Sequence, residues 1–144
     1  MIAPARRVRV VAALITSSED RRVLVQQRPP GKRRALLWEF PGGKVEAGES
    51  DEAALLREGR EELGVDLDIG PQRFETRHAY PDVEVDLHVY EARVVLGTPM
   101  PLAGQRLREV PLNELDTLAF CEADQPLVEA LLRAASEGPG RLPE

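Results

Sequence analysis

The sequence is poor in the features that mark secreted and membrane proteins. A single cysteine, Cys121, excludes an internal disulfide framework and favours a reducing compartment such as the cytoplasm. No apolar run reaches the roughly 18 residues that a membrane-spanning helix needs, and residues 1–10 lack the apolar core and cleavage site of a signal peptide. We therefore expect a cytoplasmic protein without a membrane partner, in which Cys121 is a small core residue.

Positive charge is also scarce. The chain has 19 Lys and Arg against 25 Asp and Glu, which gives a formal net charge of −6. This balance argues against a nucleic-acid polymer as partner, because polymer binding depends on basic side chains that neutralise phosphates. It does not argue against a free nucleotide, which would arrive complexed with Mg²⁺.

Repeats and internal linkers are absent as well. The 144 residues suffice for one domain with a real core. We expect a single domain over residues 1–136 and a flexible tail over residues 137–144. The oligomeric state stays open between a monomer and a homodimer.

Hydrophobic periodicity indicates a mixture of strands and helices. The strand-like segments are 8–16, 22–28, 73–80 and 83–96, with turns at 17–20 and 81–82. The helical segments are 51–63, a short turn at 112–118, and 124–135, for which Asp124 is a plausible N-cap. Mixed strands with two main helices predict an α/β fold of the α/β/α sandwich type.

The segment from Gly43 to Val65 carries the strongest chemical signal. Glu58, Glu61 and Glu62 share one face of the predicted helix, because positions i, i+3 and i+4 are neighbours at 3.6 residues per turn. Three crowded carboxylates repel one another unless a cation lies between them, and Mg²⁺ prefers such oxygen ligands. The competing interpretation is a solvated acidic face.

The surrounding residues favour a built site over a charge run. Leucines on the opposite side of the helix form a core face, and Arg57 can hold the carboxylates by charge-assisted hydrogen bonds. Ser50 is a good N-cap and Gly64 a good stop signal.

These residues resemble the Nudix box, which is long and fixed in spacing. The match comprises Gly43, Glu49, Arg57-Glu58, Arg60, Glu61-Glu62 and Leu63-Gly64-Val65. Gly59 departs from the usual larger apolar residue, and we expect it to allow a close contact between helix and sheet. The resemblance extends to the MutT branch over about residues 28–124. It implies the Nudix α/β/α sandwich with a mixed sheet.

The resemblance also implies the metal site and its chemistry. Glu58, Glu61 and Glu62 match the family's metal ligands, and the backbone carbonyl of Gly42 joins them. The implied cofactor is Mg²⁺, with Mn²⁺ as an alternative. Arg57 would orient Glu58. The implied reaction is attack of water on phosphorus, which converts a nucleoside triphosphate into the monophosphate and pyrophosphate.

One position departs from the MutT pattern and leaves the general base open. MutT-like proteins carry a further glutamate where this chain has Ala103, which can neither bind a metal nor take a proton. The base therefore comes from the box, with Glu49, Glu61 and Glu62 as candidates, or from a loop residue such as Glu109. Lower activity is the third alternative.

The nucleoside pocket is implied by resemblance too, and its residues are Arg28, Glu39, Phe40, Pro41 and Asp124. Phe40 can stack on a base or be core packing. Asp124 stands where the 8-oxoguanine-specific protein has asparagine, and aspartate matches the CTP and modified-pyrimidine branch. An ionised carboxylate suits base N–H groups, whereas a protonated one regains a donor. Asp124 is alternatively a helix cap. Lys44 is placed to meet phosphate oxygens or is solvated.

We therefore expect an Mg²⁺-dependent pyrophosphohydrolase that removes damaged or surplus nucleotides, acting on an oxidised purine or a pyrimidine triphosphate. The enzymatic alternatives are ADP-ribose or dinucleoside polyphosphate hydrolysis. The non-enzymatic alternative is a nucleotide-sensing module of the same fold. We interpret Trp38 and Tyr80 as core or pocket-rim residues, and His78 and His88 as structural.

Overall fold

A mixed sheet forms the centre of the structure, a computed structural model that describes residues 6–17 and 21–137. Its main strand order is β3-β2-β1-β6-β5, with β4 pairing with β1 and β7 with β2. The bounds are β1 (Arg7–Ser17), β2 (Arg22–Gln27), β3 (Trp38–Glu39), β4 (Gly42–Lys44), β5 (Asp66–Ala79), β6 (Glu84–Leu96) and β7 (Arg106–Pro111). The β1–β6 pairing is parallel and the other strand pairings are antiparallel, so the sheet is mixed as predicted.

Strand β1 is central because both of its faces are apolar. Val11 and Ala13 point to one hydrophobic cluster and Ala12 and Leu14 to another, since successive side chains alternate across a sheet. All four are almost completely buried. One strand therefore anchors the cores on both sides of the sheet.

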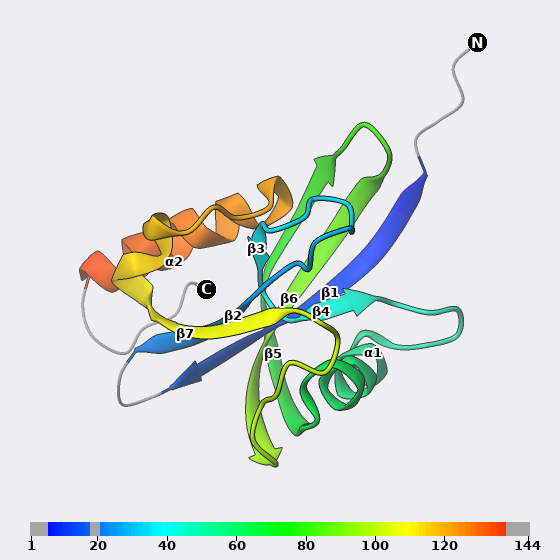
Figure 1. The fold of residues 1–144 in the computed structure, drawn as a ribbon, viewed down its shortest axis with the longest axis horizontal. Helices are drawn as coiled ribbons and strands as arrows, with labels where there is room; N and C mark the ends of the chain where they lie inside the picture. The colour runs from blue at the N-terminus through cyan, green and yellow to red at the C-terminus, as the bar shows by residue number, and fades with distance from the viewer. Residues whose placement is uncertain (1–5, 18–20, 138–144) are drawn as a thin grey trace.

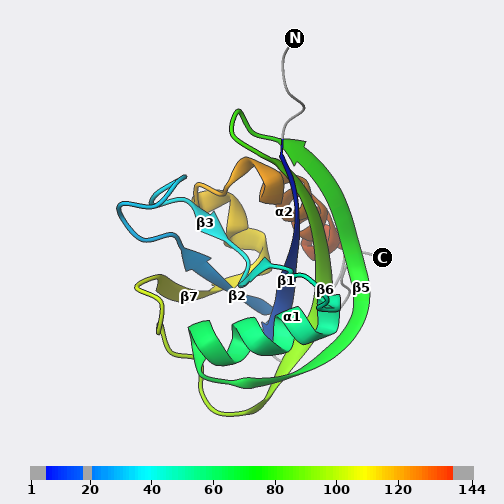
Figure 2. The same cartoon turned by 90° about the vertical axis from the view of Figure 1, so that its right-hand side faces the viewer.

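Two helices cover the opposite faces of this sheet (Figures 1 and 2). Helix α1 (Asp51–Glu58) packs against the cluster that contains Leu55, whereas α2 (Gln125–Glu137) packs against the cluster that contains Leu131. Two short 3-10 segments, η2 (Leu112–Thr117) and η3 (Glu122–Asp124), precede α2. The α/β/α sandwich predicted from the sequence is confirmed.

The helix that carries the acidic residues has the predicted extent but changes geometry in its last turn. Ser50 caps it, because its side chain accepts a hydrogen bond from the Ala53 N–H at 3.1 Å. After Glu58 the helix continues as one turn of π-helix, η1 (Gly59–Leu63). Gly64 ends it in the left-handed conformation at φ 68°.

Gly59 allows the close contact between helix and sheet that its presence predicts. A Cβ atom at this position would lie 2.9 Å from Cδ1 of Leu67 on β5. A larger residue would push the helix away from the strand. The glycine that departs from the family pattern therefore makes room for Leu67, its packing partner.

Several elements differ from the sequence prediction. Strand β5 begins at Asp66, well before residue 73, because irregular pairing around Gly70 and Pro71 lets the strand continue through two residues that normally end one. Strand β7 was not predicted at all. Helix α2 begins at Gln125 and includes Glu137, which the prediction assigned to the tail. Residues 18–20 of the predicted turn and 138–144 of the predicted tail lie outside the described residues.

Candidate active site

Glu58 and Glu62 turn inward together, toward the glycine-rich strand β4. A Cβ atom on Gly43 would lie 2.4 Å from Oε1 of Glu58, so only glycine leaves room for this carboxylate. Glu62 lies next to Glu58. A void of about 10 Å³ between helix and sheet is lined by Gly42, Glu58 and Glu62 among others. The sequence pattern predicted a common outer face, whereas two of the three glutamates point into the molecule.

The electrostatics of this pair suit a divalent cation. Burial, and then the neighbouring Glu58 carboxylate, raise the pKa of Glu62 well above its usual range. Oε2 of Glu58 is buried and has no hydrogen-bond partner among the described residues. A hard divalent cation would satisfy that oxygen and remove the repulsion. Within residues 6–17 and 21–137, no three acidic, His or Cys side chains already converge into a complete metal site.

Arg57 connects the remaining carboxylates of the helix and its preceding loop. Its guanidinium donates to Glu58 Oε1 at 2.9 Å and to Glu61 Oε2 at 3.3 Å. It also donates to the backbone oxygen of Lys44 at 3.0 Å and grips Glu49 with two bonds of 2.8 and 2.9 Å. Arg57 is therefore placed to orient Glu58, as predicted, and it fixes three further groups.

The candidate general bases have different environments. The bidentate contact with Arg57, followed by the Glu46 backbone N–H, lowers the pKa of Glu49 to about 2, which makes Glu49 a weak base. The Glu61 side chain is 60% exposed and accessible to water. Glu109 lies on β7 opposite Leu24 and lines neither the void nor the neighbouring pocket.

The loop that contains Ala103 is attached to the carbonyl of Glu62. The Leu102 N–H and Nε2 of Gln105 both donate to that oxygen, at 3.1 and 2.9 Å. The Ala103 N–H donates to Oε1 of Gln105 at 2.8 Å, and the Ala103 side chain is exposed. The three glutamates Glu58, Glu61 and Glu62 are called the acidic cluster below. The loop therefore reaches this acidic cluster without supplying a carboxylate to it.

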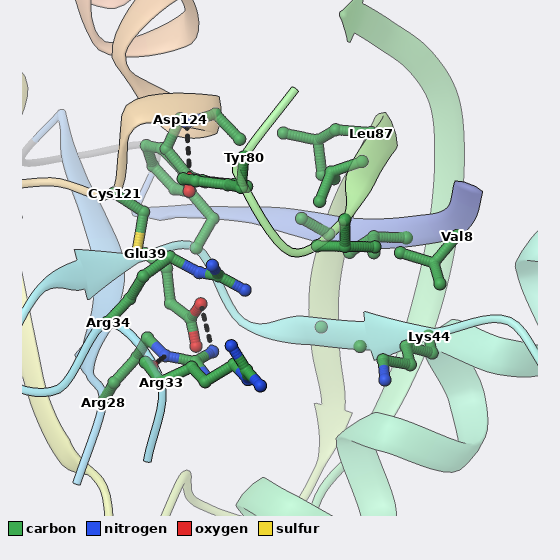
Figure 3. A pocket seen from close by; sticks show the side chains of 18 of the residues that line it. Val8, Arg28, Arg33, Arg34, Glu39, Lys44, Tyr80, Leu87, Cys121 and Asp124 are labelled. Atoms are coloured by element: carbon green, nitrogen blue, oxygen red, sulfur yellow. Dashed lines mark hydrogen bonds and ion pairs between the residues drawn. The ribbon is translucent and has the colours of Figure 1, made fainter. Parts of the chain in front are cut away.

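A pocket of about 440 Å³ adjoins the acidic cluster across Gly42 and Gly43, which line it. Figure 3 shows that the side chains that line the pocket lie on both sides of strand β4. The sequence-predicted residues that line it are Arg28, Glu39, Phe40, Lys44 and Asp124. Pro41 does not line the pocket; it borders the void instead, and its carbonyl accepts a hydrogen bond from Ala13 at 2.7 Å.

The floor of the pocket carries a buried acid. Asp124 is 7% exposed, and the Phe40 backbone N–H faces its carboxyl closely enough to lower its pKa. Burial, and then the nearby Glu39 carboxylate, raise the pKa of Asp124 well above its usual range, which favours its neutral form. A neutral carboxyl both donates and accepts. Asp124 ends η3 directly before α2, so it stands at the helix start without being a residue of the helix.

Phe40 lies in the core beneath the pocket. It is 3% exposed, and its ring stacks on Phe120 with the centroids 5.5 Å apart. One face of the ring is therefore already occupied by another aromatic side chain. The stacking of Phe40 on a base stays a prediction.

The mouth of the pocket is basic. Arg28 donates to Glu39 at 3.1 Å. Two arginines of the loop after β2, Arg33 and Arg34, both pair with Asp82, at 3.4 and 3.2 Å. The side chains of Arg28, Arg33 and Arg34 gather around Glu39, whereas Lys44 lies across the pocket (Figure 3). Cations on two sides are suited to a ligand that carries several negative charges.

Tyr80 belongs to the pocket rim, one of the two alternatives expected for it. Its hydroxyl accepts a hydrogen bond from the Ala123 N–H at 2.9 Å. The guanidinium carbon of Arg34 lies 4.0 Å from its ring centroid, a cation–π contact. Tyr80 therefore fastens the segment before Asp124 to the β5–β6 hairpin.

Sequence reasoning missed four residues of this region. It gave Arg33 and Arg34 no role, and it did not single out Asp82 or Gln26. Two adjacent arginines, and an aspartate in a turn almost 50 residues later, indicate an ion-paired site only when the two loops are known to meet. Gln26 sits in an apolar strand, and its burial at 4% exposure could not be predicted from that pattern.

The remaining reactive side chains are structural. Burial raises the pKa of the Cys121 thiol to about 12, which keeps it protonated. His88 is 6% exposed and bonds to Gln72 and Asp86. His78 bonds to Glu122 at 2.9 Å and meets the ring of Tyr80 edge-on. These contacts agree with the structural roles expected for both histidines.

Comparisons with known proteins agree with this geometry. Residues 11–130 match the family described as the NUDIX domain. The CTP pyrophosphohydrolase of Escherichia coli is 37% identical over 132 residues, 90% of this chain and 96% of the relative. The 8-oxo-dGTP diphosphatase of Haemophilus influenzae is 34% identical over 128 residues, 88% and 93% of the two chains.

The fold is shared with solved structures as well. The solution structure of the E. coli ORF135 protein has a TM-score of 0.75 and 33% identity, and the match covers 95% of this chain and 96% of that one. No helix among the described residues is long and apolar enough to cross a membrane.

Proposed function

The chain belongs to the Nudix hydrolase family as a MutT-like nucleoside triphosphate pyrophosphohydrolase, and we propose that its substrate is CTP or dCTP. The products would be the nucleoside monophosphate and pyrophosphate. The observation that carries the proposal is the adjacency of the acidic cluster and the pocket, which share Gly42. A triphosphate could extend from one to the other.

In this proposal the acidic cluster holds Mg²⁺ through Glu58, Glu61, Glu62 and the carbonyl of Gly42. Bound there, Mg²⁺ would neutralise phosphate charge and lower the pKa of a coordinated water. Mn²⁺ has the same preference for carboxylate and carbonyl oxygens and is the expected substitute. The orphaned Oε2 of Glu58 supports this assignment.

We assign proton removal from the attacking water to Glu61. Glu49 is a poor base because Arg57 holds its pKa at about 2, and Glu58 and Glu62 are packed against each other. Glu61 is the carboxylate of the box that is open to solvent. Arg57 keeps Glu58 and the Lys44 backbone in fixed positions, and Lys44 is assigned to the phosphate oxygens.

Asp124 is assigned to the base. A neutral carboxyl can donate to the N3 acceptor of cytosine and accept from its N4 amino group. Its neighbours Arg28 and Glu39 are paired with each other at 3.1 Å and would border the sugar or base. The identity to the E. coli CTP pyrophosphohydrolase over most of both chains supports this choice.

The second candidate substrate is 8-oxo-dGTP. The similarity to the H. influenzae 8-oxo-dGTP diphosphatase favours it. A neutral carboxyl at Asp124 offers a donor and an acceptor, as an amide does. It could therefore serve where the 8-oxoguanine-specific branch uses asparagine. Removal of damaged or surplus nucleotides is the cellular role that follows from either substrate.

Product analysis tests the proposal directly. The enzyme with Mg²⁺ would be supplied with CTP, dCTP, 8-oxo-dGTP, dGTP, ADP-ribose and a dinucleoside tetraphosphate, and kcat/KM determined for each. The expected result is monophosphate plus pyrophosphate, with the highest kcat/KM for the cytidine nucleotides. A higher value for 8-oxo-dGTP would select the second candidate. Turnover confined to ADP-ribose or the dinucleotide would contradict the pocket assignment. Nucleotide binding without turnover would indicate a sensing module.

A further inference from the structure

The aromatic rings that line the pocket already have partners of their own. Among the residues that the structure describes, these rings are Phe40 and Tyr80. Phe40 is 3% exposed and stacks on Phe120. The Tyr80 ring lies 4.0 Å from the guanidinium carbon of Arg34 and meets the His78 ring edge-on. A base in this pocket would therefore gain from another flat group on which to stack.

The guanidinium of Arg34 is such a group, and two neighbours hold it in place. One face lies against Tyr80, which is a cation–π contact. One edge meets Asp82, because Nη1 donates to Oδ1 at 3.2 Å. Arg34 lines the pocket, and in Figure 3 its side chain lies between the Tyr80 ring and the carboxylate of Glu39. The face of the guanidinium away from Tyr80 is therefore turned toward the pocket.

The neighbouring Arg33 shows what is particular to Arg34. Arg33 also pairs with Asp82, but its side chain is 73% exposed, against 23% for Arg34. Among the described residues, the arginines that lie over an aromatic ring are Arg34 and Arg108. Arg33 thus contributes positive charge to the mouth of the pocket, whereas Arg34 contributes a fixed plane as well.

The backbone of the loop after β2 adopts an unfavourable conformation around this side chain. Arg34 has a φ of 56° and Leu36 a φ of 65°, in the left-handed region that disfavours residues with a Cβ atom. The Leu36 side chain is 53% exposed, so its burial does not offset the cost. A loop that served only as a connection could avoid this conformation. The backbone therefore points to a use for the Arg34 side chain.

We propose that the guanidinium of Arg34 is the surface on which the base stacks, with Tyr80 behind it and Asp82 holding its edge. This inference rests on the proposed function for the nature of the ligand. Guanidinium planes stack on bases, and their positive charge is attracted to the π-face of a base. Arg34 thus determines how tightly the nucleoside part of the substrate binds.

The stacking surface is also fixed relative to the acid assigned to the edge of the base. The Tyr80 hydroxyl accepts a hydrogen bond from the Ala123 N–H at 2.9 Å, directly before Asp124. Arg34, Tyr80 and the Asp124 segment therefore form one connected wall. Arg34 contacts the face of the base while Asp124 contacts its edge.

The test uses two ligands that each represent one part of a nucleotide. Nuclear magnetic resonance titrations measure binding of 2′-deoxycytidine and 8-oxo-2′-deoxyguanosine, which carry no phosphate, and of inorganic pyrophosphate with Mg²⁺, which carries no base. Arg34→Lys keeps the charge but offers no plane. We expect it to weaken binding of the better nucleoside about tenfold and to leave the pyrophosphate affinity within about twofold.

Arg108→Lys is the matched control. The guanidinium carbon of Arg108 lies 5.9 Å from the ring centroid of Trp38, and Arg108 does not line the pocket. This variant should bind both ligands as the unmodified protein does. An unchanged nucleoside affinity in Arg34→Lys, or equal weakening of both ligands, would overturn the proposal. So would the absence of saturable binding of either nucleoside to the unmodified protein.

A second variant tests the anchor of the guanidinium. Asp82→Asn retains Arg34 and Tyr80 but removes the ion pair, and it should weaken nucleoside binding about threefold. The double variant Arg34→Lys with Asp82→Asn should bind the nucleoside no more weakly than Arg34→Lys, because no plane is left for Asp82 to hold. Losses that multiply in the double variant would contradict the shared role.

The nucleoside titrations do not depend on turnover. Absence of triphosphate hydrolysis by the unmodified protein would refute the proposed function, and the titrations would still decide whether Arg34 stacks on the base. Hydrolysis of a triphosphate together with an unchanged nucleoside affinity in Arg34→Lys would refute the role of Arg34 alone.

Discussion

The acidic cluster and the nucleoside pocket are built in opposite ways. The cluster draws its charged groups from a short continuous stretch, Glu49 to Glu62, with Arg57 bonded to three of the carboxylates. The pocket draws its lining from β1, the loop after β2, β4, the β5–β6 hairpin and η3. The cluster is tight and encloses about 10 Å³, whereas the pocket encloses about 440 Å³.

The difference separates chemistry from selectivity. Residues that share a helix and its cap hold their relative positions through local hydrogen bonds, which suits a site that must orient phosphorus and water within a fraction of an ångström. Residues on separate loops can be exchanged one at a time without disturbing that geometry. Substitutions in the cluster should therefore lower turnover, whereas substitutions in the pocket should change the preference between substrates.

The largest effect is expected from Glu62→Gln in the cluster. Loss of a metal-binding carboxylate should cost about 4 kcal/mol of transition-state stabilisation, which is about a 10³-fold lower kcat. The melting temperature without metal should stay equal or rise, because burial and Glu58 oppose ionisation at this position. Steady-state kinetics and thermal melts check this, with the exposed Glu52→Gln as control. A near-normal kcat would remove Glu62 from the metal site.

Arg57→Lys should have the next largest effect. A lysine offers a point charge and cannot reproduce the fork that grips Glu49 while also reaching Glu58 and Lys44 O. Misorientation of a metal-binding carboxylate should weaken Mn²⁺ binding about 10–100-fold, measured by titration. Arg60→Lys, which alters an exposed ion pair with Asp66, is the matched control. Equal effects of the two substitutions would contradict the central role of Arg57.

Asp124→Asn should change selectivity in the pocket and leave the cluster intact. The substitution keeps a carbonyl for the Phe40 N–H but fixes the donor as an amide. We expect the ratio of kcat/KM for CTP to that for 8-oxo-dGTP to shift by about tenfold, since each base hydrogen bond contributes about 1–3 kcal/mol. Mn²⁺ affinity should not move. A constant ratio with reduced thermal stability would restrict Asp124 to a structural role beside α2.

The smallest effect concerns a polar group outside both regions. Asp51, at the start of α1, accepts hydrogen bonds from Arg9 and Tyr90. The Arg9 contact lowers the pKa of Asp51 to about 2, so its contribution to stability is complete above pH 4 and is lost as pH falls through 2. Burial, and then the Asp51 contact, raise the pKa of Tyr90 to about 12, so its contribution is complete below pH 10 and is lost as pH rises through 12.

Urea unfolding across pH would reveal both limbs. Tyr90→Phe should flatten the decline between pH 10 and 12 and reduce the acidic limb slightly, because the Tyr90 hydroxyl is a lesser cause of the lowered Asp51 pKa beside Arg9. An alkaline decline of the same size in Tyr90→Phe would assign it to other groups.

The same contrast explains how much the sequence could predict. The helix from Asp51 to Leu63, its Ser50 cap and its Gly64 stop follow from local preferences, and all three are confirmed. The inward turn of Glu58 and Glu62 contradicts the prediction that the acids lie opposite the leucines, but it agrees with regular helix geometry. At about 100° per residue, both glutamates lie within about 60° of Leu55, which faces the core.

Long-range pairing accounts for the other failures. Strand β7 has only Leu107 and Val110 as apolar residues, and it is a strand because β2 offers a partner for it. The pocket residues Arg33, Arg34 and Asp82 come together only when two loops meet. The sandwich with a mixed sheet was accessible through resemblance, since apolar alternation alone does not specify which strands pair.

The parallel pairing of β1 with β6 has a consequence for the order in which the molecule becomes active. Val8 pairs with Val85 and Val10 with Leu87, and all four side chains line the pocket. Contacts between such distant positions form late in folding. During synthesis the helix with its glutamates is made before β6. The growing chain thus carries the groups for hydrolysis before it has a place to receive a nucleotide, and recognition is acquired last.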